Sequence, residues 1–76
     1  MKIEILGTGC TKCKALEANV KEAIKQIGGF HQVVKVEDPI EIINYGVMST
    51  PGLVVDGEVK SSGKLLSVDE VLEVLT

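Results

Sequence analysis

The only two cysteines of this 76-residue chain, Cys10 and Cys13, stand three residues apart. A disulfide stabilises a fold mainly by closing a long loop, and this pair would close almost none. A chain this short buries only a modest part of its surface, so it needs an efficient core. Hydrophobic residues make up 45% of the chain, with no Trp, one Phe and one Tyr, so aliphatic side chains must supply that core. The two thiols are therefore badly placed for a stabilising disulfide and well placed for chemistry.

The hydrophobic pattern predicts one domain over residues 1–76, with the element order βαβαββα. The expected strands are residues 2–6, 32–36, 53–55 and 58–61, and the expected helices are residues 11–27, residues 39–45 and a last one that begins at a capping box of Ser67 and Glu70. Asp56-Gly57 is a strong two-residue hairpin signal. The β–α–β start implies a parallel strand pair, and the hairpin adds an antiparallel edge. The fold class is therefore α/β with a mixed sheet.

The charge and hydropathy of the chain argue against two classes of partner, nucleic acids and membranes. The net charge is −3, the lysines are spread along the chain and Arg is absent, which argues against nucleic acid as a partner. No stretch approaches the ~20 apolar residues of a membrane span, and the first residues do not resemble an export signal. We therefore expect a cytoplasmic protein without a membrane partner. In that compartment, cysteine pairs are more often catalytic or metal-binding than structural.

The cysteine motif lies where the first strand passes into the first helix. A thiol at a helix N-terminus faces unpaired backbone N–H groups and the positive end of the helix dipole, and both favour the reactive thiolate. We expect Cys10 to attack a substrate disulfide and Cys13, one turn later on the same helix face, to resolve the mixed disulfide. Between them lie Thr11 and Lys12, and the Lys12 charge is expected to lower the thiol pKa further.

A metal site is the alternative to redox chemistry. Two thiolates make half of a tetrahedral zinc site, but there is no second CxxC, and the only histidine, His31, is expected near the far end of the first helix. A closed zinc site is therefore not predicted. A soft ion such as Cu(I) needs only two thiolates, so a Cu(I)-binding chaperone stays open as the second hypothesis.

The whole chain resembles the thioredoxin superfamily, and most closely the small, glutaredoxin-sized prokaryotic proteins called redox-active disulfide proteins. Two motifs carry the resemblance: Gly-Thr-Gly-Cys-Thr-Lys-Cys at residues 7–13, and Val-Met-Ser-Thr-Pro-Gly-Leu-Val-Val-Asp-Gly at residues 47–57. The resemblance implies a four-stranded mixed sheet with helices on both faces. It also implies a cis bond between Thr50 and Pro51 beside the CxxC, and Gly63 as a glycine that keeps the approach to the site open. Thr50, Pro51 and Gly63 are therefore the expected substrate-binding residues.

The resemblance further implies a thiol–disulfide oxidoreductase that exchanges electrons with protein disulfides and needs no cofactor. Its partners would be those substrates and a thiol or flavoprotein reductase, and nothing in the chain requires an oligomer, so a monomer is expected. Lys12 stands where ordinary thioredoxins have a proline, so no redox potential is implied. Small copper chaperones of ferredoxin-like fold also begin with a strand, CxxC and a helix, but Thr8 stands where they carry Met, and their second half has another element order.

Glu4 lies six residues before Cys10, where thioredoxins carry a buried acid that accepts the proton of the second thiol. Its alternation with Ile3 and Ile5 fits a solvated strand residue instead, and glutamates are seldom buried. We therefore predict that Glu4 is solvated.

Overall fold

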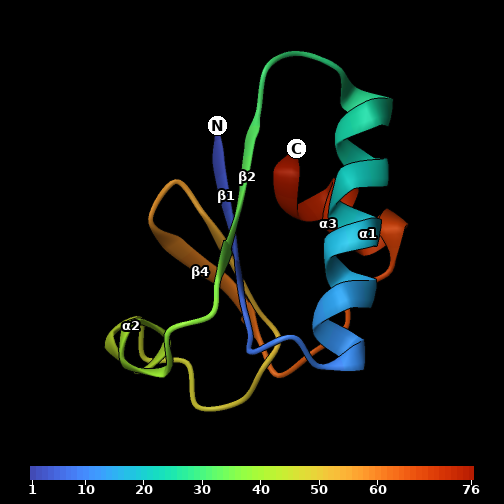
Figure 1. Ribbon diagram of the computed structural model, residues 1–76. Helices are drawn as coiled ribbons and strands as arrows, with labels where there is room; N and C mark the ends of the chain where they lie inside the picture. The colour runs from blue at the N-terminus through green and yellow to red at the C-terminus, as the bar shows by residue number, and fades with distance from the viewer.

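The computed structural model describes residues 1–76 and has the predicted order of elements (Figure 1). The elements are β1 (Lys2–Leu6), α1 (Thr11–Ile27), β2 (Gln32–Val36), α2 (Pro39–Asn44), β3 (Gly52–Val55), β4 (Glu58–Ser62) and α3 (Val68–Leu75). None of the three helices has both the length and the apolar character that crossing a membrane requires.

The helix ends follow from local capping chemistry. The Asp38 side chain accepts a hydrogen bond from the Ile40 N–H at 2.9 Å, and Pro39 occupies the first helical position. Ser67 and Glu70 form the predicted capping box before α3. Three predicted boundaries shift by one residue: β3 begins at Gly52, β4 ends at Ser62, and α2 ends at Asn44, because Tyr45 is its C-cap residue and not part of the helix.

The four strands form one mixed sheet in the order β2-β1-β3-β4. β1 runs parallel to β2 and antiparallel to β3, as the β–α–β start and the hairpin predict. The β3–β4 turn has φ of 49° at Asp56 and 84° at Gly57. Two successive positive φ values are what a tight hairpin turn requires, and Asp-Gly is a pair that adopts them.

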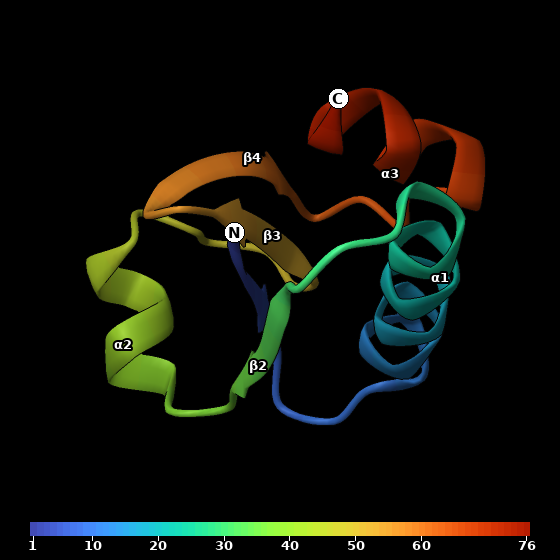
Figure 2. The same ribbon diagram turned by 90° about the horizontal axis from the view of Figure 1, so that it is seen from above.

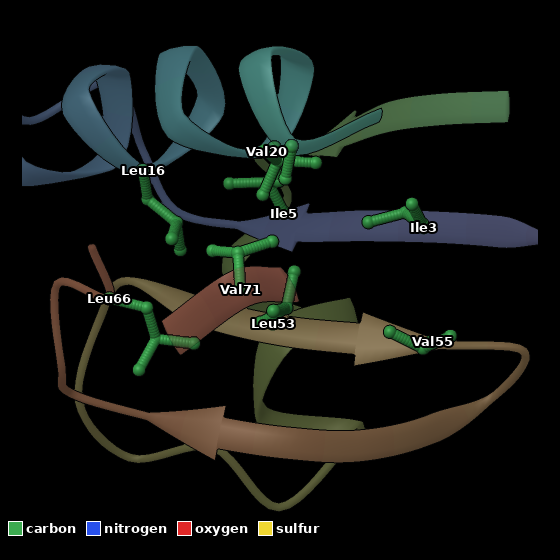
Figure 3. Close-up of a cluster of buried hydrophobic side chains, with 9 residues drawn as sticks. Ile3, Ile5, Leu16, Val20, Leu53, Val55, Leu66 and Val71 are labelled. Carbon is green, nitrogen blue, oxygen red and sulfur yellow. The ribbon is translucent and has the colours of Figure 1, made fainter. Parts of the chain in front are cut away.

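The helices cover both faces of the sheet, which confirms the expected fold class. Figure 2 shows α1 and α3 together on one face and α2 on the other. The larger core lies under α1 and α3, where side chains of β1 and β3 point towards the two helices (Figure 3). It consists of Ile3, Ile5, Leu16, Val20, Ala23, Leu53, Val55, Leu66 and Val71. Burial of these aliphatic side chains is the main force that docks α1 on the sheet.

A smaller core lies under α2. It contains Leu6, Val36, Ile42, Val47 and Val54, with Tyr45 packed against it. Leu6 and Val54 come from the positions of β1 and β3 that alternate with those of the larger core. β1 is thus buried along both of its sides.

The prediction that Glu4 is solvated is wrong. Glu4 is only 7% exposed, and its Oε2 accepts a hydrogen bond from the Tyr45 hydroxyl at 2.6 Å. Its Oε1 lies 3.8 Å from the Lys2 ammonium. The alternation in β1 is real, but α2 covers the second side of the strand, so that side has no solvent to face. Tyr45 and Lys2 supply the partners that a buried carboxylate needs.

We expect Tyr45 to titrate above its ordinary pKa of 10.0, because ionisation would break the hydrogen bond to Glu4 and place two negative charges together. Folding is then favoured below the unfolded pKa of Tyr, and this contribution is lost as the pH rises through the folded pKa. Tyr45 is the only tyrosine and Trp is absent, so ultraviolet absorbance measures this titration directly. Glu4→Gln should lower the Tyr45 pKa towards the ordinary value.

Glu41→Gln is the matched control, since Glu41 is the smallest of the causes that raise the Tyr45 pKa, and it should change the titration less. An unchanged midpoint in Glu4→Gln would show that the hydrogen bond does not govern this tyrosine.

Candidate active site

Cys10 is the N-cap residue of α1. Its backbone is extended, with φ −69° and ψ 164°, and its Sγ accepts a hydrogen bond from the Cys13 N–H at 3.2 Å. The sulfur therefore occupies the place that a Ser or Asp oxygen takes in an ordinary N-cap. Cys10 is exposed and Cys13 is 5% exposed, so only one of the two thiols faces incoming molecules.

The two cysteines form a disulfide with their Cα atoms 5.1 Å apart. This separation lies inside the range of about 4.4–6.8 Å in which a disulfide forms without backbone movement. No other cysteine is present, so the pair is a self-contained dithiol/disulfide couple.

Thr11 and Lys12 are exposed in the first turn of α1. That turn contains no acidic residue, so no carboxylate opposes the positive end of the helix dipole near Cys10. The Lys12 ammonium adds positive charge on the same turn. The surroundings of the Cys10 sulfur therefore favour an anion.

Gly7 brings the end of β1 against the second cysteine, a role that the sequence analysis did not foresee. A Cβ built on Gly7 would overlap Cys13 Sγ and lie 3.9 Å from Thr50 Cβ. Any larger residue at position 7 would therefore push the first turn of α1 away from the sheet. A glycine at the end of a strand is also typical of a simple turn between strand and helix, so the sequence alone does not predict this close approach.

The Thr50–Pro51 turn lies at the same end of the molecule as the cysteines (Figure 1). Its peptide bond is cis, and the Pro51 side chain is fully buried. The Gly63 N–H donates a hydrogen bond to the Pro51 carbonyl at 2.9 Å. A Cβ on Gly63, whose φ is +71°, would lie 2.8 Å from Ser49 Cβ. The structure thus brings the second predicted motif next to the first and places Gly63 against the turn.

Two further side chains near this turn differ in their surroundings. Met48, two residues before Thr50, is 97% exposed. Tyr45 is half-buried and packs against the smaller core while it donates its hydroxyl to Glu4. Met48 is therefore free to meet a substrate, and Tyr45 belongs to the interior.

The arrangement does not resemble a zinc centre. No group of three or more His, Cys, Asp or Glu side chains lies close enough together to hold a metal ion. His31 interacts with the Met1 amino group, 3.3 Å away, and with the Gly28 carbonyl, 2.8 Å away, beyond the C-terminal end of α1. The element order also ends on a helix, unlike the ferredoxin-like copper chaperones that share the first half of this pattern.

Comparison with known proteins agrees with this geometry. The family model described as "Thioredoxin domain" matches residues 1–76. A curated thioredoxin of Methanothermobacter thermautotrophicus is 41% identical over 76 residues, which cover 100% of this chain and 99% of that protein. A thioredoxin of Methanocaldococcus jannaschii is 42% identical over 73 residues, which cover 96% of this chain and 84% of that protein. The chain therefore belongs to the thioredoxin family and, with its Cys10–Cys13 pair, is a thiol–disulfide oxidoreductase.

Proposed function

We propose that Cys10 is the nucleophile and Cys13 the resolving thiol in the reduction of protein disulfides. The observation that carries this assignment is the difference in exposure between two sulfurs one helical turn apart: Cys10 is exposed, whereas Cys13 is 5% exposed. A substrate disulfide can reach the first sulfur and not the second. Cys10 also has the N-cap position, where a thiolate receives a hydrogen bond and the helix dipole.

The first step is attack on the substrate. The Cys10 thiolate attacks one sulfur of the substrate disulfide, a mixed disulfide forms, and the other substrate sulfur leaves as a thiolate. The N–H of Cys13, which points at Cys10 Sγ from 3.2 Å, stabilises the thiolate before the attack. No group has to move into place, because this donor is part of the helix backbone.

The second step releases the substrate. The Cys13 thiolate attacks Cys10 Sγ, the intramolecular disulfide forms, and the second substrate sulfur leaves reduced. Two electrons pass from the dithiol to the substrate. The Cα–Cα separation of 5.1 Å lets this bond close on a backbone already in place.

Thr50, Pro51 and Gly63 are proposed to hold the substrate chain. Pro51 uses its carbonyl to accept from Gly63, whereas Thr50 takes part in no backbone–backbone hydrogen bond. The N–H and C=O of Thr50 are therefore available to pair with an extended peptide, as an added strand would. Backbone pairing does not depend on side chains, so it suits an enzyme with several protein substrates.

Family membership implies a reductase that returns electrons to the Cys10–Cys13 pair. We propose a thiol or flavoprotein reductase for this role, acting in the cytoplasm on residues 1–76 as one monomeric domain. In that reaction the reductant's thiolate attacks the exposed Cys10 Sγ and Cys13 leaves, which is the resolving step in reverse.

The first test traps the intermediate. In Cys13→Ser, a mixed disulfide to substrate should accumulate on Cys10, because no second thiol can release it. Cys10→Ser should trap almost nothing, because the remaining thiol is buried. Mass spectrometry of the products after incubation with an oxidised protein substrate measures both, and the opposite pattern would reverse the assignment.

A second prediction concerns Lys12. Lys12→Glu should slow alkylation of Cys10 at neutral pH by roughly threefold to tenfold, because a like charge beside the thiolate disfavours it. Lys25→Glu makes the same charge change in the last turn of α1 and should leave the rate nearly unchanged. Alkylation with iodoacetamide, followed by mass spectrometry, measures the rate; equal rates in the two variants would remove Lys12 from the tuning of Cys10.

A third prediction separates substrate binding from thiol chemistry. Gly63→Ala should lower reduction of a protein disulfide by roughly tenfold, because its Cβ would displace Ser49 and the adjoining turn. Reduction of a small aromatic disulfide, which needs no peptide groove, should change less than about twofold on the same argument.

Gly46→Ala is the matched control. Its φ of +82° carries the same backbone penalty, but a Cβ there meets no atom within 4 Å. If Gly46→Ala lowered protein-disulfide reduction as much as Gly63→Ala, general destabilisation would account for the loss, and the groove assignment would fail.

A further inference from the structure

A small pocket with charged walls opens beside the buried cysteine. Cys13, Ile5, Gly7 and Gly9 line it together with the charged residues Lys14, Glu17, Lys35 and Glu37. About 20 Å³ of the pocket is available to the centre of a water molecule. One water needs about 10–15 Å³ by this measure, so the pocket has room for one next to Cys13.

Glu17 lines this pocket together with Cys13, and both residues belong to one rigid element, the helix α1. It lies four residues after Cys13, on the same face of α1. Its Oε1 is 3.6 Å from the Lys35 ammonium of β2, and its Oε2 is 3.2 Å from that of Lys21. The side chain is 19% exposed, so its carboxylate is held between two cations and is still reached by water.

Glu4 cannot take this place. It belongs to the side of β1 that α2 covers, where Tyr45 and Lys2 occupy its oxygens. Cys13 lies with Ile5 and α1 on the other face of the sheet. A sheet layer therefore separates the buried acid of β1 from the resolving thiol.

We propose that Glu17 accepts, through the pocket water, the proton that Cys13 loses when it resolves the mixed disulfide. The inference rests on the proposed role of Cys13 as the resolving thiol. The proton passes from Cys13 Sγ to the water, and a proton of that water passes to the Glu17 carboxylate. The Cys13 thiolate then attacks Cys10 Sγ, and the substrate sulfur leaves with the electron pair of the broken bond. Glu17 later gives its proton to solvent at the pocket mouth.

The charges around the pocket assist this transfer. Lys35 and Lys14 add positive charge beside the developing thiolate, and Lys21 holds the far oxygen of Glu17; Glu37 also lines the pocket but takes no part in the transfer. β1 contributes only Ile5, and the residue that follows the strand is Gly7; neither carries a charge. Glu37 makes no salt bridge, whereas Lys35 and Lys21 each contact one oxygen of the Glu17 carboxylate.

The test measures the resolving step alone. Reduced protein is mixed with a substoichiometric aromatic disulfide, and the two successive releases of the coloured thiolate report mixed-disulfide formation and its resolution. In Glu17→Gln the second release should slow by about tenfold near neutral pH. General-base assistance contributes about 10²–10⁴-fold, and the expected loss is smaller here because water reaches this pocket and replaces part of the assistance. The first release should stay unchanged. The deficit should shrink as the pH rises beyond ~8.5, where a free thiol begins to ionise without an acceptor.

A purely electrostatic role for Glu17 predicts the opposite sign, because removal of a negative charge favours the Cys13 thiolate and would speed resolution. Glu37→Gln and Glu4→Gln are matched controls and should stay within about twofold of the unaltered protein. Glu17→Asp should recover part of the rate. A Glu17→Gln rate equal to or faster than the original, or an equal deficit in Glu4→Gln, would overturn the proposal. Reversed trapping in the cysteine variants would instead show that Cys13 is not the resolving thiol.

Discussion

The contact between Gly7 and Cys13 is the constraint on which the site depends. With no Cβ at position 7, the first turn of α1 lies directly against the end of β1 and beside Thr50. The larger core then fixes the rest of α1, because Leu16, Val20 and Ala23 are fully buried against the sheet and α3. α1 is therefore held at its first turn by the close contact with the end of β1 and along the rest of its length by aliphatic packing. The positions of both sulfurs follow from that placement and need no metal or second disulfide.

Covering both faces of so small a sheet has an electrostatic consequence. From Ile3 to Leu6, each residue of β1 has to be apolar or to have a polar partner, because neither side of the strand reaches water there. Glu4 contacts Tyr45 and Lys2, and these contacts hold its side chain on the α2 face of the sheet. A carboxylate for chemistry at Cys13 then has to come from the other face. On that face α1 itself supplies Glu17, one turn beyond the thiol.

The sequence predicted most of the fold because its local signals are strong and agree with one another. The aliphatic stripe of α1, the Ser67–Glu70 capping box and the Asp56-Gly57 turn each specify one local structure, and the structure contains all three. It failed at Glu4, because alternation in a strand does not say whether the second face is covered. Tertiary packing determines the close approach at Gly7 and the grouping of Glu17 with Lys35. Short-range sequence patterns do not predict such packing.

The two cysteines are chemically identical and become different through geometry alone. Cys10 stands at the N-cap, exposed and hydrogen-bonded by the Cys13 N–H, whereas Cys13 is enclosed by Gly7 and the first turn of α1. Exposure and the helix dipole favour the anion at the first sulfur, and burial disfavours it at the second. Under the proposed assignment, the first thiol remains reactive towards substrates, while the second has to lose its proton only when a mixed disulfide is in place. A proton acceptor is needed at the buried sulfur for the same reason that none is needed at the exposed one.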